Sequence, residues 1–197
     1  MNITILDDFV SKENADHLEK IHLAPYFPWH FENSTDDIET IKNYNLDIQS
    51  KIKLTHYFNH SFFEDDWKQS VNSNFFNFII GLFPLEKLSL DRITRFKSNL
   101  YTKINNFDKC NHHILHNDLN KKYNDISDKV YSLLYYVIYS DGDTVFFENG
   151  KELKRVTPKK GRAILFKSNI LHAGSNPINY NYRITTNLVF IKNEFKS

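Results

Sequence analysis

The stretch SLLYYVIYSDGDTVFFENG, residues 132–150, is the part of the sequence that decides the fold. It begins as an apolar and aromatic run, breaks at Asp141-Gly142-Asp143, and continues as a second short apolar run. Short runs of β-formers that are separated by turn residues are typical of antiparallel strands. The stretch therefore predicts two neighbouring strands of a mainly β protein.

The same pattern continues on both sides of this stretch. Further turn residues stand at Asn149-Gly150 and Pro158-Lys159-Lys160-Gly161. Many short strands in a row favour a double-stranded β-helix, or jelly roll, although periodicity alone leaves a β-sandwich open. The strands are expected at residues 92–104, 131–139, 144–147, 153–156, 162–166 and 182–191.

The first half of the chain carries helical signals instead. Ser11 can cap a helix that runs through Ile21, and apolar residues at helical spacing predict a second helix over about 64–82. Helices followed by many strands indicate an α+β protein. We expect one domain over residues 1–197, with a helical support region at 1–87 and a catalytic core at 88–192 that folds as the double-stranded β-helix.

Composition limits the classes of function. The 197 residues have a net charge of +1, which argues against a strongly electrostatic nucleic-acid binder and favours a protein, peptide or small-molecule substrate. A single cysteine, Cys110, excludes an internal disulfide. The opening residues do not resemble a signal peptide, and the most apolar run, 75–83, is too short to span a bilayer. These features predict a soluble, cytoplasmic protein without a membrane partner.

Four polar residues in the second half form a candidate site: His116, Asp118, His172 and Arg183. On an extended segment alternate side chains point the same way, so His116 and Asp118 can reach one ion while Asn117 faces elsewhere. His172 follows the strand expected at 162–166. Two histidines and one carboxylate are the usual protein ligands of non-haem Fe(II) that binds O₂, although Mn(II) and Zn(II) also suit them.

Arg183 opens the strand YRITTNLVF, residues 182–190, where it shares a face with Thr185 and Asn187. An arginine beside a hydroxyl group inside a barrel can bind a carboxylate through a charged fork and one further donor. The simplest co-substrate that chelates iron at one end and offers a carboxylate at the other is 2-oxoglutarate.

With these residues in place, the chain resembles the Fe(II)/2-oxoglutarate-dependent dioxygenases, and more narrowly their prolyl 4-hydroxylase-like branch of phage or microbial type. The resemblance covers about residues 90–192 and rests on the order of the four site residues and on the segments 132–150, 156–177 and 182–190. It implies oxidative decarboxylation of 2-oxoglutarate coupled to hydroxylation of a substrate C–H bond, in a prolyl or another amino-acid side chain. A phage-encoded member would act in a host cytoplasm.

The resemblance also implies cofactors and further site residues. It calls for Fe(II), 2-oxoglutarate as co-substrate and O₂, with ascorbate as a candidate supporting reductant. Tyr136 matches a tyrosine that joins the arginine at the distal carboxylate in such enzymes. Tyr101 matches a tyrosine on the preceding strand that hydrogen-bonds the co-substrate.

Other interpretations stay open at this point. His172 could be a surface-loop histidine, Arg183 a partner in a strand-end salt bridge, and Tyr136 a core tyrosine. His112 and His113 are expected in a loop near the mouth of the site, where they could touch the substrate. The alternative functions are a metal-binding jelly roll without catalysis and a cupin-type metalloenzyme that does not use 2-oxoglutarate.

Overall fold

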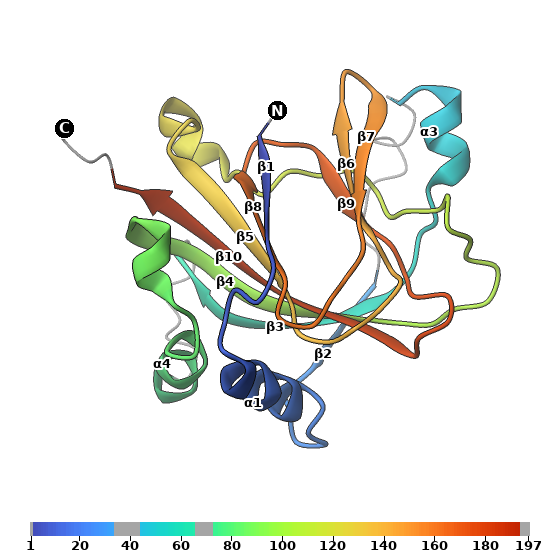
Figure 1. Ribbon diagram of the computed structural model, residues 1–197. Coiled ribbons are helices and arrows are strands. Elements are labelled where there is room, and N and C mark those ends of the chain that lie inside the picture. Colours follow the sequence, from blue (N-terminus) through green and yellow to red (C-terminus); the bar gives the residue numbers. More distant parts are fainter. Residues whose placement is uncertain (1, 34–43, 66–72, 194–197) are drawn as a thin grey trace.

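The computed structural model describes residues 2–33, 44–65 and 73–193. Two antiparallel sheets form the walls of a barrel-like core; the helices at 12–22 and 73–80 lie against the larger sheet, and the helix at 46–51 lies beside the smaller one (Figure 1). The protein is mainly β, and the predicted double-stranded β-helix is confirmed.

The larger sheet has seven strands and the smaller sheet has three. The order in the larger sheet is β1-β8-β5-β10-β4-β3-β2, and its strands are, in chain order, β1 (Ile3–Leu6), β2 (His30–Glu32), β3 (Tyr57–Glu64), β4 (Leu90–Thr102), β5 (Val130–Tyr136), β8 (Ala163–Lys167) and β10 (Tyr182–Lys192). The order in the smaller sheet is β7-β6-β9, and its strands are β6 (Thr144–Glu148), β7 (Lys151–Val156) and β9 (His172–Gly174).

The helices in the described parts of the chain are short. Ser11 caps the first of them by accepting a hydrogen bond from the Asn14 backbone N–H at 3.2 Å, as the sequence predicts. None of these helices has both the length and the apolar character needed to span a membrane. They are α1 (Lys12–His22), α3 (Leu46–Lys51), α4 (Ser73–Ile80) and the 3₁₀ helices η1 (Leu85–Leu88) and η2 (Lys121–Ile126).

The six strands expected from the sequence are all present, with ends that differ by a few residues. The first half differs more from the prediction. Within the range expected as one helix, 64–82, the structure has helix α4 over Ser73–Ile80, whereas Glu64 belongs to strand β3; residues 66–72 lie outside the described part. Four strands were not expected: β1, β2 and β3 extend the larger sheet at both edges, and β9 carries His172 in the smaller sheet. Pairing with a long neighbouring strand overrides weak local preferences, and β3 pairs along β4 in this way.

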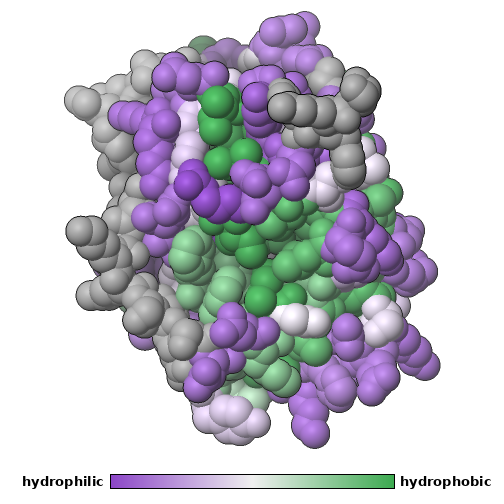
Figure 2. Space-filling model, turned by 90° about the vertical axis from the view of Figure 1, so that its left-hand side faces the viewer, coloured by the Kyte–Doolittle hydropathy of each residue, from purple (hydrophilic) through white to green (hydrophobic). Residues whose placement is uncertain are grey.

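Helices α1 and α4 cover one face of the larger sheet. Leu18 of α1 and Ile79 of α4 are fully buried in one cluster with Phe96 of β4 and Phe190 of β10. Figure 2 shows apolar side chains gathered across the side of the molecule that carries α4, where Phe78 is exposed. Burial of this apolar surface is the main force that holds the helices to the sheet.

The opposite face of the same strands is polar. Along β4, Phe96 and Leu100 pack towards the helices, whereas the alternate residues Lys97, Asn99 and Tyr101 line a cavity between the sheets. The neighbouring strand β10 repeats this alternation, with Arg183, Thr185 and Asn187 on the cavity side. Both strands therefore bring apolar side chains to the core and polar side chains to the cavity.

Candidate metal centre

The three predicted ligands come together where residues 113–118 run beside strand β9. His116 and His172 form an antiparallel bridge, with backbone N–H to carbonyl distances of 3.0 and 2.9 Å. The Asp118 N–H continues the pairing by donating to the Ser168 carbonyl at 2.8 Å. The backbone thus fixes the distance between the two histidines before any ion binds.

The side chains of this triad converge on one point. Each of His116, Asp118 and His172 offers one ligand atom, and these atoms all lie within 4.8 Å of one another. Asp118 and His172 are buried, while the His116 ring remains accessible from the cavity. Asn117 is exposed, as expected from the alternation of side chains along an extended segment.

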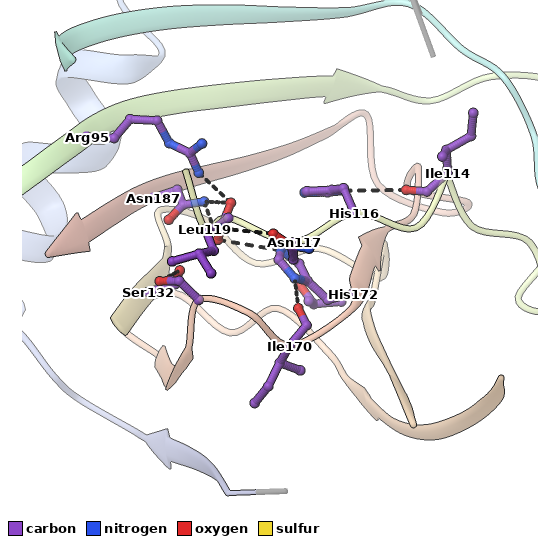
Figure 3. A network of polar contacts seen from close by, with 12 residues as sticks. Arg95, Ile114, His116, Asn117, Leu119, Ser132, Ile170, His172 and Asn187 are labelled. Carbon is purple, nitrogen blue, oxygen red and sulfur yellow. Dashed lines mark hydrogen bonds and ion pairs between the residues drawn. The ribbon is translucent and has the colours of Figure 1, made fainter. Parts of the chain in front are cut away.

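Hydrogen bonds orient both imidazole rings. The Nδ1 atom of His172 lies 2.9 Å from the Ile170 carbonyl, and that of His116 lies 3.4 Å from the Ile114 carbonyl (Figure 3). A carbonyl accepts only from a protonated nitrogen, so these contacts place the proton of each ring on Nδ1 and leave Nε2 as the ligand atom. Desolvation of the His116 ring within the cavity lowers its pKa, which favours the neutral imidazole.

Two side chains from the larger sheet hold the Asp118 carboxylate. Arg95 forms an ion pair with Oδ1, and the Asn187 amide donates to Oδ1 and Oδ2 at 3.2 and 3.1 Å (Figure 3). Burial alone would raise the pKa of Asp118, but the positive charge of Arg95 and the hydrogen bonds from Asn187 lower it far below its usual value. Asp118 is therefore an ionised ligand at neutral pH.

Beside the triad lies a cavity of about 270 Å³. Arg183 is 3% exposed and forms one wall, where its Nε donates to the Gly142 carbonyl at 2.7 Å and its Nη2 to Thr144 Oγ1 at 2.9 Å. Gly142 permits this packing, because a Cβ there would lie 2.4 Å from the Ser175 carbonyl oxygen and 2.9 Å from Arg183 Cδ. The rigid guanidinium is thus aimed at the space next to the ligands.

Three further predicted residues lie around Arg183. Thr185 and Tyr101 line the cavity with it, and the guanidinium stands 5.5 Å from the centre of the Tyr101 ring. Tyr136 is fully buried and does not line the cavity. Its hydroxyl lies 2.6 Å from Thr144 Oγ1 and 3.1 Å from the Val156 carbonyl, so Tyr136 supports Thr144 instead of forming the wall. Burial raises the pKa of Tyr136 to about 12.

The two histidines expected near the mouth of the site are both buried. His113 lines the cavity, packs against Tyr101 with a centroid distance of 4.5 Å and hydrogen-bonds through Nε2 to Asn176 Oδ1. His112 points away, bonds through Nδ1 to the His113 carbonyl and lies against Phe147. Only His113 can therefore touch a bound molecule.

The prediction missed Arg95, Lys97 and Thr144 as members of the site. Arg95 and Lys97 share the face of Tyr101 on strand β4, so the alternation in the sequence RFKSNLY contained the signal. Thr144 begins the strand after the 141–143 turn, and only the folded chain shows that Arg183 reaches it.

The donor set suits a divalent transition metal. Two imidazoles and one ionised carboxylate lie on one side of the point where an ion would bind, and the cavity lies next to them. This chemistry fits Fe(II), and also Mn(II), with positions left for other ligands. A second requirement of such sites, hydrogen bonds that orient the ligands, is met for all three residues.

Comparison with protein families agrees with this geometry. Residues 102–190 match the model of the 2OG-Fe(II) oxygenase superfamily, where 2OG stands for 2-oxoglutarate. The predicted resemblance to this superfamily is thereby confirmed, and the match supports an oxygenase with Fe(II) and 2-oxoglutarate. No curated protein matches the sequence.

Solved structures show that the fold is shared. A 2OG-Fe(II) oxygenase family oxidoreductase from Burkholderia pseudomallei has a TM-score of 0.63 at 14% identity, with 98% of this chain and 86% of that chain covered. A prolyl hydroxylase from Trichoplax adhaerens, in complex with a peptide fragment of hypoxia inducible factor, has a TM-score of 0.56 at 13% identity, with 96% and 83% covered. A prolyl-4-hydroxylase from Pseudomonas putida has a TM-score of 0.50 at 13% identity, with 98% and 93% covered.

Proposed function

Since residues 102–190 carry the pattern of the 2OG-Fe(II) oxygenase superfamily, we propose that this protein is an Fe(II)- and 2-oxoglutarate-dependent dioxygenase that hydroxylates a C–H bond of its substrate. The observation that carries the proposal is the convergence of His116, Asp118 and His172 beside a cavity that Arg183 lines. Metal binding alone would not require the buried arginine, whereas binding of a co-substrate with a distal carboxylate does.

His116, Asp118 and His172 would hold Fe(II), which supplies activation of O₂ for the oxidative decarboxylation of 2-oxoglutarate to succinate and hydroxylation of the substrate. Arg95 and Asn187 keep the Asp118 carboxylate ionised and oriented. The carbonyls of Ile114 and Ile170 keep Nε2 of the two histidines available.

Arg183 binds the distal carboxylate of the co-substrate in this proposal. Two of its guanidinium nitrogens are held by Gly142 and Thr144, which pre-orients the side chain so that little rotamer entropy is lost on binding. Thr185 lies two residues further along the same face and offers one more donor. Tyr136 acts through Thr144, and Tyr101 forms the wall on the other side of the guanidinium.

We propose an amino-acid side chain, with proline among the candidates, as the position that is hydroxylated. Two of the solved structures that share this fold are described as prolyl hydroxylases. Near-neutral net charge favours a protein, peptide or small molecule over a nucleic acid. Because one fold hosts many substrates, the reaction type transfers from relatives better than the substrate does.

The proposal is tested by turnover of the co-substrate. Protein purified under argon and supplied with Fe(II) should bind 2-oxoglutarate and release succinate when air is admitted. Asp118→Ala and His172→Ala should each abolish metal binding and succinate release. His112→Ala is the matched control, because His112 is buried nearby but points away from the cavity. Succinate release that survives both ligand substitutions would overturn the assignment.

A further inference from the structure

Lys97 is a cation inside the cavity that the proposed binding of iron and 2-oxoglutarate does not use. It lies on strand β4 opposite Asn187 of β10, on the same face as Tyr101, and lines the cavity together with the metal-binding histidines His116 and His172. Lys97 therefore stands next to the reacting centre.

Within the described part of the chain, Lys97 also has no counter-ion in direct contact. Among the described residues it has no hydrogen-bond or ion-pair partner, and none of the described residues that line the cavity is an aspartate or a glutamate. Burial lowers its pKa to about 8, so the ammonium form still predominates at neutral pH. An uncompensated cation in an enclosed site destabilises the protein unless a bound anion offsets it.

The co-substrate does not supply that anion. The charges of Fe(II) and 2-oxoglutarate cancel, and the distal carboxylate of 2-oxoglutarate is bound by Arg183 in the proposed function. Asp118 already pairs with Arg95, and Glu64 and Glu32 act on Lys97 only from a distance, since neither forms an ion pair with it in the described structure. In the proposed binding mode neither Fe(II) nor the distal carboxylate engages Lys97, so its ammonium is available to a further anion.

Two further observations point to a small polar ligand next to Lys97. Asn99, its neighbour on the cavity face, is 9% exposed, and its Oδ1 has no hydrogen-bond partner in the described structure. A cation and an unpaired acceptor side by side match the carboxylate and ammonium groups of an α-amino acid. The cavity of about 270 Å³ is small, since ligand pockets typically span roughly 300–1,000 Å³.

We propose that the substrate is a free amino acid whose carboxylate binds Lys97, and that this lysine is the specificity-determining residue. The inference rests on the proposed function, because it assumes that Arg183 and the metal are occupied by 2-oxoglutarate. An internal residue of a peptide has no such carboxylate beside its side chain. Lys97 therefore selects the free acid over the same residue within a chain.

The test is calorimetric and needs no turnover. Protein loaded with Mn(II) and N-oxalylglycine, a non-reactive analogue of 2-oxoglutarate, is titrated with each free L-amino acid and with its carboxamide. At least one acid should bind roughly tenfold or more tightly than its amide, as expected for one charge-assisted contact. Lys97→Met should bind both forms alike, whereas Lys97→Arg should retain the preference.

Lys53→Met is the matched control, because Lys53 also lines the cavity but is exposed at its rim. It should leave the preference for the acid unchanged. Equal affinity for acids and amides, no binding of any acid, tighter binding of an acidic peptide, or weaker binding of N-oxalylglycine in Lys97→Met would each overturn the inference. Failure of the wild-type protein to bind N-oxalylglycine appears before any amino acid is added and would overturn the proposed function instead.

Discussion

The two faces of strands β4 and β10 treat polar groups in different ways. On the face that the helices cover, His22 of α1 lies 2.8 Å from Ser98 Oγ, which lies 3.1 Å from Thr186 Oγ1, and the other ring nitrogen of His22 lies 2.7 Å from the Leu18 carbonyl. The polar side-chain atoms of His22, Ser98 and Thr186 thus all have partners within the protein. On the cavity face, oxygens of Asn99 and Asn187 are buried without partners.

The difference shows which face is built for stability and which for binding. Buried polar groups in native proteins are nearly always hydrogen-bonded, so groups that lack a partner in a cavity indicate where a ligand binds. Substitutions on the helix face should change the free energy of unfolding. Substitutions on the cavity face should change binding and leave stability nearly intact.

The largest effect is expected at Phe96, on the helix face of β4. Its ring is fully buried and lies 4.9 Å from the Phe62 ring and 5.9 Å from the Phe83 ring, centroid to centroid. Phe96→Ala should lower the free energy of unfolding by about 3–5 kcal/mol in urea titrations, because it leaves a cavity in the core. Lys97→Met, one residue along on the other face, should cost far less. A larger loss of unfolding free energy in Lys97→Met than in Phe96→Ala would contradict the distinction between the two faces.

A pH effect of similar size is expected from His22, because burial lowers its pKa from 6.5 to about 4. His22 binds a proton more readily in the unfolded chain than in the folded protein, so the free energy of unfolding falls as the pH drops from 6.5 towards 4. Below pH 4 His22 is protonated in both states and makes no further contribution to the fall. The loss is about 3 kcal/mol. Urea titrations at pH 7 and pH 4 should show it, and the pH dependence should be smaller in His22→Gln. An equal dependence in both proteins would contradict the assigned burial.

On the cavity face, Arg183→Met should weaken 2-oxoglutarate binding by about 100-fold, or about 2.7 kcal/mol, because two charge-assisted hydrogen bonds are lost. Anaerobic calorimetry with Mn(II)-loaded protein measures this directly. Metal affinity should stay unchanged. Arg162→Met serves as control, since Arg162 pairs with Asp7 near the surface. Loss of the metal together with the co-substrate would show that Arg183 supports the fold of the site instead.

The smallest effects come from two neighbours on β10 that face opposite ways. Asn187→Leu should weaken Fe(II) binding by about tenfold, since the Asp118 carboxylate loses two hydrogen bonds that orient it. Thr186→Val should leave Fe(II) binding alone and lower the free energy of unfolding by about 1 kcal/mol, because its hydroxyl contacts Ser98. Competition with a chelator and urea titration distinguish the two. Equal changes of Fe(II) affinity and of unfolding free energy in the two variants would contradict the distinction between the faces.

Sequence reasoning reached the fold and the centre of the site for a physical reason. Strand alternation is a local rule, so it paired His116 with Asp118 and Arg183 with Thr185 on common faces, as the structure has them. It could not tell which residues of different strands meet. The contact of Arg95 with Asp118 and of Arg183 with Thr144 depends on the sheet order, which no local pattern encodes. The contact of the Tyr136 hydroxyl with Thr144 depends on the packing of the two sheets in the same way.

His116, Asp118 and His172 are expected to hold one Fe(II) per chain beside the polar face of the larger sheet. Equilibrium dialysis under argon, with iron counted per chain, measures this binding. One Fe(II) is expected for each wild-type chain, and none for His172→Ala under the same conditions. An unchanged iron content in a His172→Ala protein that keeps its fold by circular dichroism would show that these residues do not hold the metal.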